Sequence, residues 1–179
     1  PLDGIPVVLL HGFPQRASSW AAVSEHLHAA GLRTYAPDQR GYSPGARPKS
    51  RFGYGAAGLT SDLVALIEAI DSGPVHLVGH DWGSAVAWSV AGNHPDLISS
   101  FTAVSVPHPG AFMRSMLSSL QVFKSYYMGL FQLPFLPEWM LGSGRGDKLL
   151  RAGGMTKEMV ATFHTEIVEY GDLVLNLET

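Results

Sequence analysis

The sequence predicts an α/β protein in which a parallel sheet is flanked by helices and followed by a helical segment. Over residues 6–106, short apolar runs typical of buried strands alternate with helical patterns. One of these strands passes through a sharp, glycine-flanked turn directly into a helix. After residue 107 the helical stretches are rich in Met, Phe, Tyr and Leu and are broken by Pro and Gly, with no convincing strand.

The first two predicted strands are joined by a helix. Residues 6–10 form a continuous apolar run, as expected of a strand buried on both faces of a parallel sheet. Ser18 or Ser19 is expected to cap the helix that follows, and Gly31 to end it. Residues 32–36 then form the second strand, so the chain begins with a strand, helix and strand unit.

A second helix and two more strands complete the predicted sheet. Residues 75–78 form the strand that leads into the glycine-flanked turn, the helical pattern resumes over 85–91, and 98–106 form another buried strand. Ligands of parallel sheets bind beyond the carboxyl ends of the strands, so the loops that follow these strands are the candidate functional region. One face of the preceding helix is traced by Leu59, Leu63, Leu66, Ile67 and Ile70.

Composition narrows the classes of partner. The chain has 179 residues, 46% of them hydrophobic and 15% charged, with a net charge of -3. This charge favours neither nucleic acid nor an anionic membrane as partner. The absence of cysteine excludes disulfides and cysteine metal sites, and no segment reaches the roughly 20 apolar residues of a membrane span. We expect a cytoplasmic protein without metal or cofactor, whose native N-terminus precedes Pro1.

The glycine-flanked turn is the most informative stretch. It reads Gly-His-Asp-Trp-Gly-Ser over residues 79–84, and small residues at Gly79 and Gly83 let strand and helix approach closely while Asp81 is held at the apex. The familiar form of this turn carries serine there. A carboxylate can instead attack an alkyl carbon and form an ester that is then hydrolysed. An acidic residue can also simply cap the helix, so this stretch alone leaves both interpretations open.

Three motifs together indicate a family. They are His-Gly-Phe-Pro at residues 11–14, Asp-Gln-Arg-Gly-Tyr-Ser at 38–43 and Gly-His-Asp-Trp-Gly-Ser at 79–84. In this order and spacing the chain resembles the epoxide hydrolases of the α/β-hydrolase fold, with haloalkane and fluoroacetate dehalogenases as their nearest relatives. The resemblance covers essentially the whole chain. It implies part of an α/β-hydrolase core over residues 1–108 and part of a helical cap over 109–179.

The resemblance assigns roles to residues at the strand ends. Asp81 would attack an epoxide carbon, and water would hydrolyse the resulting ester to give a vicinal diol. The backbone N–H groups of Phe13 and Trp82 would form the oxyanion hole for the second step. The side chains of His11, Phe13, Trp82 and Tyr127 would line the substrate pocket. The implied partners are a small apolar epoxide and water.

Ring opening also needs a proton for the departing alkoxide, which a cap tyrosine supplies in this family. That tyrosine lies four residues before a Phe-Gln-x-Pro sequence, and counting back from Phe131 selects Tyr127 rather than Tyr126. An unperturbed tyrosine pKa near 10 suits protonation of a much more basic alkoxide. The alternative that Tyr127 only packs the cap onto the core stays open.

The sequence departs from the family pattern near its end. A second cap tyrosine usually follows Leu-Asn-Trp, but the Leu-Asn at 175–176 is followed by Leu177. The acid and the histidine base of the family come later still, and we expect each of the eight histidines here to be structural or exposed. The sequence is therefore expected to be a fragment of a larger enzyme or a truncated reading frame. Without the base, Asp81 could be alkylated only once.

Three functions other than epoxide hydrolysis are alternatives for this sequence. A haloalkane dehalogenase would use the same Asp81 ester, but those enzymes often carry Asn in place of Phe13, whose side chain cannot donate a hydrogen bond to halide. A serine esterase is disfavoured because Ser84 lies too far into the helix. The alternative of another class is a non-catalytic α/β-hydrolase-like protein that binds a small molecule. Neither the particular epoxide nor the oligomeric state can be predicted.

Overall fold

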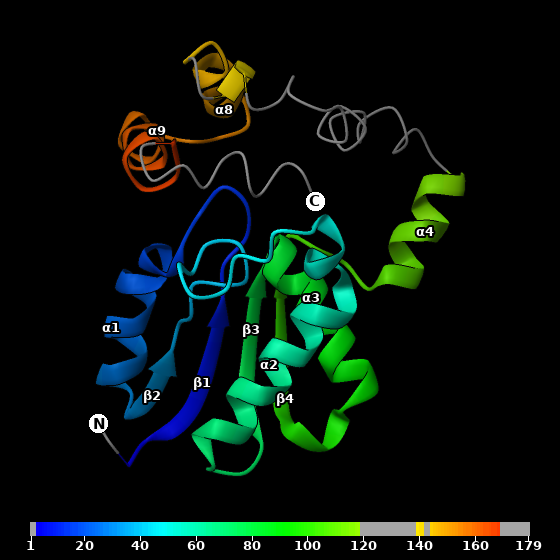
Figure 1. The fold of residues 1–179 in the computed structure, drawn as a ribbon. Helices are drawn as coiled ribbons and strands as arrows, with labels where there is room; N and C mark the ends of the chain where they lie inside the picture. The colour runs from blue at the N-terminus through cyan, green and yellow to red at the C-terminus, as the bar shows by residue number, and fades with distance from the viewer. Residues whose placement is uncertain (1–2, 119–138, 142–143, 169–179) are drawn as a thin grey trace. The chain divides into compact units, whose positions relative to one another are not determined.

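The computed structural model describes residues 3–118, 139–141 and 144–168. The chain divides into two compact units, Pro1–Phe112 and Met113–Thr179. The first unit contains the sheet, and the described part of the second is helical (Figure 1). Tyr127 and the Leu-Asn sequence at 175–176 lie outside the described residues, so the predictions made for them stay predictions.

Four parallel strands form the sheet in the order β2-β1-β3-β4 (Figure 1). All three pairings are parallel, as the continuous apolar runs predict. Leu10 of β1 aligns with Gly79 of β3, and His80 of β3 aligns with Val104 of β4. The carboxyl ends of the strands therefore meet at one edge of the sheet. The strands are β1 (Ile5–Leu10), β2 (Leu32–Tyr35), β3 (Val75–His80) and β4 (Ile98–Val104).

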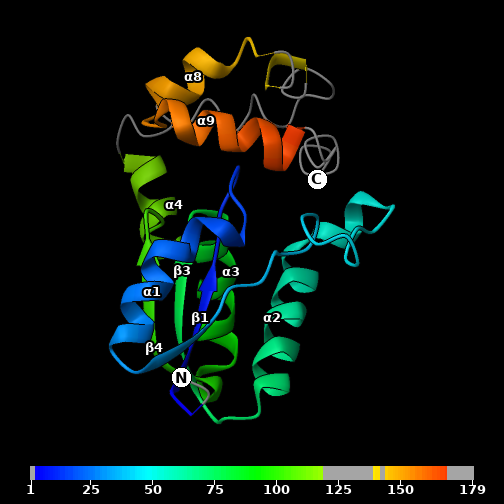
Figure 2. The same ribbon diagram turned by 90° about the vertical axis from the view of Figure 1, so that its left-hand side faces the viewer.

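Three helices cover the two faces of this sheet. They are α1 (Ala21–Ala29), α2 (Ala56–Ile70) and α3 (Trp82–Asn93). Figure 2 shows α1 on one side of the sheet and α2 and α3 on the other. Short 3-10 helices precede α1 and α2 and follow α3, at Ala17–Trp20, Arg51–Tyr54 and Pro95–Leu97.

The main core of the first unit lies between the sheet and the α2–α3 face. Alternate residues of the central strands β1 and β3 point to this face, while their neighbours point to the other. The core therefore stabilises the two strands whose ends carry the candidate site. Its buried members are Val8, Leu10, Leu63, Ile67, Val75, Leu77, Val86, Ala87 and Val90.

Two predicted boundaries differ from the structure. The first helix has no serine cap: residues Ala17–Trp20 form a 3-10 helix, and the Ser19 hydroxyl donates backwards to the Arg16 carbonyl over 2.7 Å. Gly31, with φ of +82°, ends the turn after α1 as predicted. The last strand ends at Val104 instead of 106, because Ser105 adopts a φ of +70° and leaves the extended conformation.

The second unit is described over its helices α8 (Asp147–Ala152) and α9 (Lys157–Phe163) and a π-helical turn (His164–Val168). Thr156 caps α9, because its hydroxyl accepts a hydrogen bond from the Met159 N–H over 3.2 Å. Met159 shares the helical spacing of Phe163 and Ile167, but the residue is 38% exposed. The buried residues are Val160, Phe163 and Ile167. A further helix, α4 (Pro109–Ser118), begins in the first unit.

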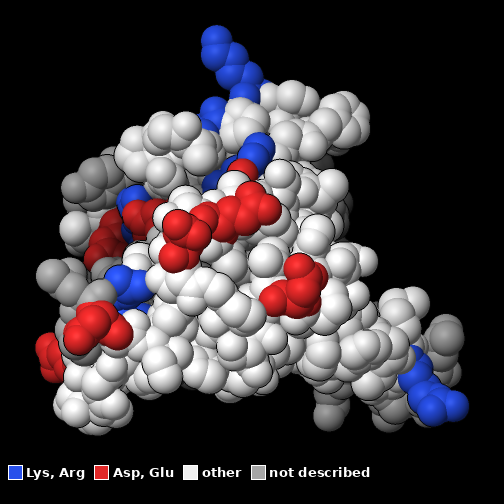
Figure 3. All heavy atoms as spheres, turned by 90° about the horizontal axis from the view of Figure 1, so that it is seen from below, with Lys and Arg blue, Asp and Glu red and all other residues white. Residues whose placement is uncertain are grey.

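Within the described residues, no helix is both long and apolar enough to cross a bilayer. Figure 3 shows the face at which the strands begin. This face is largely neutral, with Asp and Glu in several groups and Lys and Arg that do not merge into one continuous patch.

Candidate active site

Asp81 is the single residue between the end of β3 and the start of α3. Its φ of +51° and ψ of -122° form a conformation that L-residues rarely adopt, and such backbone typically costs about 1–3 kcal/mol. Backbone hydrogen bonds hold it from both sides: its N–H donates to the Val104 carbonyl over 3.2 Å, and its carbonyl accepts from the N–H groups of Ser84 and Ala85. The structure therefore presents the carboxylate at the carboxyl edge of the sheet.

The side chain of Asp81 does not cap α3. No cap hydrogen bond joins it to the first turn of the helix. Its Oδ1 instead accepts a hydrogen bond from the backbone N–H of Phe13 over 3.0 Å, in the loop after β1. The sequence leaves open whether Asp81 caps the helix or acts as a nucleophile. The structure excludes a side-chain cap at Asp81.

Two glycines permit this close arrangement. A Cβ atom on Gly12 would lie 2.7 Å from Oδ1 of Asp81, and a Cβ atom on Gly79 would lie 2.6 Å from the Gly83 carbonyl oxygen. Both separations are too short for any side chain. The close approach of strand and helix that the sequence predicts at Gly79 and Gly83 is confirmed, and Gly12 is a third position that must lack a side chain.

Trp82 directly follows Asp81 in the chain. It is the first residue of α3, where the first N–H groups of a helix have no partner within the helix. Among the described residues no hydrogen-bond acceptor is found for this N–H. Its indole is 59% exposed. The structure thus places the Phe13 N–H on the Asp81 carboxylate, and the Trp82 N–H belongs to the next residue in the chain.

His11 lies inside the wall of the site. Its side chain has no exposed surface, whereas the sequence analysis placed it in the substrate pocket. Its Nε2 accepts a hydrogen bond from the Gln39 N–H over 3.1 Å, so the proton of the neutral ring is on Nδ1, which faces the Gly12 carbonyl at 3.3 Å. The Gln39 side-chain amide donates in return to the His11 carbonyl, and the Tyr42 ring packs edge-on against the imidazole. Burial lowers the pKa of His11, which keeps this ring neutral.

The loop after β2 is fixed to the loop after β1 by Asp38. Its carboxylate accepts hydrogen bonds from Nε and Nη2 of Arg16, at 3.1 and 2.7 Å, and from the Ala17 N–H at 2.9 Å. Burial acts to raise the pKa of Asp38, but these hydrogen bonds outweigh it and hold the pKa below its usual value. Sequence reasoning quoted Asp38 only as part of a motif and did not foresee Arg16 as its partner.

A second ion pair holds the following loop on α2. Arg40 donates through Nε and Nη2 to the two carboxylate oxygens of Asp62, each over 2.6 Å, and through Nη1 to the Gly53 carbonyl over 3.0 Å. Sequence reasoning missed this pair as well. The signal that could have pointed to this pair is weak. Arg40 directly follows Asp38 and Gln39 in the sequence, and Asp62 lies on the exposed side of the next predicted helix.

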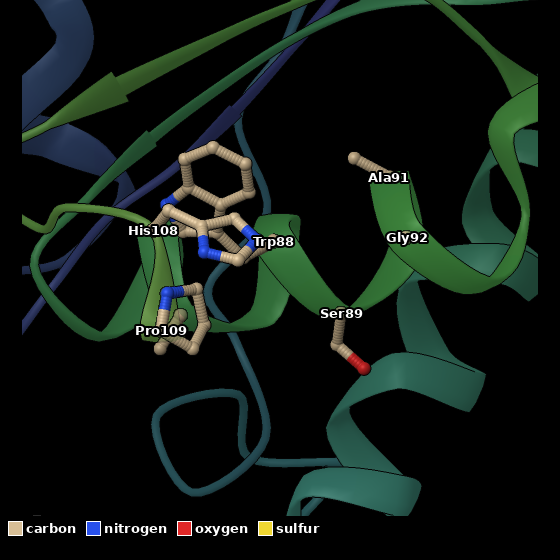
Figure 4. Close-up of a pocket in the computed structure, with 7 residues that line it drawn as sticks. Trp88, Ser89, Ala91, Gly92, His108 and Pro109 are labelled. Carbon is tan, nitrogen blue, oxygen red and sulfur yellow. The ribbon is translucent and has the colours of Figure 1, made fainter. Parts of the chain in front are cut away.

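The hollow shown in Figure 4 is separate from this site. It has a volume of about 390 Å³ and lies in the first unit. The indole of Trp88 packs edge-on against His108, with ring centres 4.9 Å apart, and donates to the Val106 carbonyl over 3.2 Å. Neither Asp81 nor Phe13 contributes to the lining, so this hollow is not part of the arrangement around the carboxylate. The lining residues are Ala85, Trp88, Ser89, Ala91, Gly92, His108 and Pro109.

Over the described ranges, no three His, Asp or Glu side chains gather closely enough to hold a metal ion. The carboxylate itself has one hydrogen-bond partner among these residues, the Phe13 N–H. The arrangement therefore offers a nucleophilic oxygen and backbone donors, which suits ester formation and ester hydrolysis.

A carboxylate held on a turn between a parallel strand and a helix, facing a backbone donor from a neighbouring loop, defines a hydrolase-type site. Residues 5–140 match the family model described as alpha/beta hydrolase fold, and the chain belongs to this family. The fold class that the three motifs predict is thereby confirmed.

Individual relatives include epoxide hydrolases. The chain is 37% identical over 167 residues to the AB hydrolase superfamily protein YfhM of Bacillus subtilis, a match covering 93% of this chain and 58% of that protein. It is 39% identical over 138 residues to epoxide hydrolase A of Mycobacterium tuberculosis, covering 73% of this chain and 42% of that one. These relatives confirm the resemblance to epoxide hydrolases, and the chain spans about half the length of each.

A solved epoxide hydrolase structure is similar to this chain in fold. The structure of an epoxide hydrolase mutant from Bacillus megaterium, complexed with its product (R)-3-[1]naphthyloxy-propane-1,2-diol, is similar to this chain with a TM-score of 0.81 and 26% sequence identity. The similarity covers 99% of this chain and 67% of that one. The parallel sheet and its helices are therefore those of known epoxide hydrolases.

Proposed function

We propose that the intact protein hydrolyses an epoxide to a vicinal diol through an ester on Asp81. One observation carries this proposal: Asp81 occupies the strained apex between β3 and α3, and its carboxylate accepts from the Phe13 N–H instead of capping the helix. Relatives named epoxide hydrolases support it, since the chain is 39% identical to one of them and similar in fold to another.

In the first step an oxygen of Asp81 attacks one carbon of the epoxide ring. Oδ1 is held by the Phe13 N–H, so Oδ2, which has no hydrogen bond among the described residues, is the oxygen left for attack. A C–O bond forms, the C–O bond of the ring breaks, and the leaving oxygen carries the electron pair. In the proposal Tyr127 gives that oxygen its proton.

In the second step water attacks the carbonyl carbon of the ester. Negative charge then develops on Oδ1, the oxygen that already accepts from the Phe13 N–H, and the Trp82 N–H lies on the neighbouring residue as a second donor. Such donors typically contribute about a hundredfold or more each to the rate. The bond between the carbonyl carbon and Oδ2 breaks, and the diol leaves with that oxygen and with the proton that the base took from water. Asp81 is then a carboxylate again, in which one oxygen comes from water.

The attacking water also needs a base. Among the described residues no histidine is hydrogen-bonded to the Asp81 carboxylate. The proposal therefore places the base outside the described residues of the intact protein, where the family pattern has a histidine.

The proposed substrate is a small apolar epoxide. The product bound to the mutant of the Bacillus megaterium enzyme is a vicinal diol that carries a naphthyl ether, so that mutant holds an aromatic group beside the diol carbons. The exposed indole of Trp82 would offer an apolar surface next to Asp81 in this chain.

The test compares the intact wild-type protein with an Asp81→Asn variant on phenyl glycidyl ether, with the diol quantified by chromatography. We expect diol from the wild type and none above the uncatalysed rate from the variant, while both give the same circular dichroism spectrum. Diol formation by the variant at the wild-type rate would overturn the proposal.

The same assay separates the alternatives. Release of halide from a haloalkane without epoxide turnover would indicate a dehalogenase instead. Saturable binding of the epoxide by the wild type, with neither diol nor covalent adduct, would indicate a binding protein. Each of these two results would contradict epoxide hydrolysis.

A further inference from the structure

The buried hydroxyl of Ser84 contacts backbone groups of both strands that flank the turn at Asp81. We propose that Ser84 is a positioning residue, whose hydroxyl holds the end of β4 against this turn and so keeps Asp81 in its strained conformation. The inference that this matters for attack on an epoxide rests on the proposed function. We call the Ser84 hydroxyl, with its hydrogen bonds to Gly79 and Val104, the clamp. The clamp can be measured without any substrate.

The first support is the set of partners around the hydroxyl. Ser84 has no exposed surface. Its Oγ is hydrogen-bonded to the Gly79 carbonyl in β3, to the Val104 carbonyl in β4 over 3.1 Å, and to the Val104 N–H over 3.2 Å. Because a serine hydroxyl has one proton and two lone pairs, it accepts from the Val104 N–H while donating to one of the two carbonyls. One side chain of α3 thereby ties two neighbouring strands together.

The second support is that the same groups hold Asp81. The Val104 carbonyl that faces the Ser84 hydroxyl also accepts the Asp81 N–H over 3.2 Å, and the Ser84 N–H donates to the Asp81 carbonyl over 2.9 Å. Val104 is the last residue of β4, and Ser105 turns away with a φ of +70°. The clamp therefore acts at the point where β4 would otherwise be free to separate from the turn.

Small size alone does not account for a serine at this position. An alanine would also fit between strand and helix, and a hydroxyl costs free energy when it is buried unless its hydrogen bonds are made. Here they are made to both strands. Because its side chain is fully buried, Ser84 cannot reach a substrate, and its effect on chemistry must pass through Asp81.

The experiment measures amide hydrogen exchange by NMR in the intact wild-type protein and in the Ser84→Ala and Ser89→Ala variants. Ser89 is a matched control, since it lies on the same helix and its hydroxyl accepts from Thr60 over 3.0 Å, away from the turn. We expect exchange at Asp81 and Val104 to be about tenfold faster in Ser84→Ala and unchanged in Ser89→Ala. Unchanged exchange in Ser84→Ala, or equal acceleration in both variants, would overturn the proposal.

The link to chemistry is measured in a single turnover with phenyl glycidyl ether. We expect the maximum rate of ester formation at Asp81 to fall about tenfold or more in Ser84→Ala, while the half-saturating epoxide concentration stays the same, because attack depends on orientation. A Ser84→Ala rate equal to wild type would contradict a positioning role. If the wild type forms no ester at all, the proposed function fails, and the exchange data still decide whether the clamp exists.

If the Ser84→Ala variant does not fold, a measurement on the wild-type protein still decides whether the clamp exists. A hydroxyl proton held in a buried hydrogen bond exchanges slowly enough to be detected by NMR. We expect a Ser84 hydroxyl resonance with a nuclear Overhauser contact to the Val104 amide proton in the wild-type protein. A Ser84 side chain that averages among rotamers, with no such contact, would overturn the clamp.

Discussion

The backbone N–H of Phe13 donates to Oδ1 of Asp81 across 3.0 Å, although the two residues are 68 positions apart. The donor that would stabilise a tetrahedral intermediate is therefore already in place before any substrate binds. This preorganisation joins a loop and a turn that the sequence separates by two helices and two strands, α1, β2, α2 and β3.

Replacing Gly12 should disrupt this contact directly. In Gly12→Ala the new Cβ would lie 2.7 Å from Oδ1 of Asp81, and forcing extra volume into a packed site typically costs about 1–3 kcal/mol. We expect a lower free energy of unfolding and loss of diol formation, measured by urea denaturation and chromatography.

Gly92→Ala is the control for that substitution. An added Cβ at Gly92 meets no atom within 4 Å, and alanine favours the helix by up to about 1 kcal/mol. We expect Gly92→Ala to be neutral or stabilising. A Gly12→Ala variant as stable and as active as Gly92→Ala would show that the close packing around Asp81 is absent.

The buried ring of His11 should make stability depend on pH. Its pKa is lowered in the folded state by burial, so the unfolded chain binds a proton more readily. The contribution of neutral His11 is complete above the unfolded pKa near 6.5, and it is lost as pH falls below that value toward the lower folded pKa.

The measurement is urea denaturation from pH 8 to pH 5. We expect the wild type to lose up to about 1.4 kcal/mol per pH unit through His11 in the acidic part of this range, and His11→Gln to show a smaller slope. Equal slopes in the two proteins would mean that His11 does not stay neutral in the folded state.

The two ion pairs of the loops should differ in their contribution to stability. Asp38 is partly buried and binds both Arg16 and the Ala17 N–H, whereas the Asp62 side chain is 43% exposed in its pair with Arg40. We expect Asp38→Asn to cost about 1–3 kcal/mol and Asp62→Asn about 0–1 kcal/mol, measured by urea denaturation at pH 7. The reverse order would refute the importance given to the Asp38 contacts.

The proton donor can be tested by comparing neighbouring tyrosines. Under the proposed mechanism, Tyr127→Phe should lower the rate of ester formation at Asp81 by about 10²–10⁴-fold, because the alkoxide loses its acid. Tyr126→Phe should leave that rate close to wild type. A large effect of Tyr126→Phe together with a normal rate in Tyr127→Phe would reassign the donor.

The sheet could be predicted from sequence because its strands are buried on both faces and therefore appear as continuous apolar runs. The turn at Asp81 was equally accessible, since Gly79 and Gly83 flank a single polar apex at the junction of a strand and a helix. Both features depend on residues that are close together in the sequence, so both can be predicted from the sequence alone.

The features that were missed depend on distant partners. The expected serine cap is absent where the Ala17 N–H bonds to Asp38, 21 positions further along the chain. His11 was placed in the pocket, but its ring is buried by Gln39 and Tyr42 from the loop after β2. No local pattern shows whether a polar ring after a strand faces solvent or a neighbouring loop.

The most direct test of the account is a single turnover of an epoxide in ¹⁸O-labelled water, with enzyme in excess and the peptide containing Asp81 analysed by mass spectrometry. The account predicts that the heavy oxygen enters the Asp81 carboxylate and that the first diol released is unlabelled, because its new oxygen comes from the enzyme. Labelled diol with an unlabelled Asp81 peptide would mean that water attacks the epoxide directly, and the Asp81 ester would have to be abandoned.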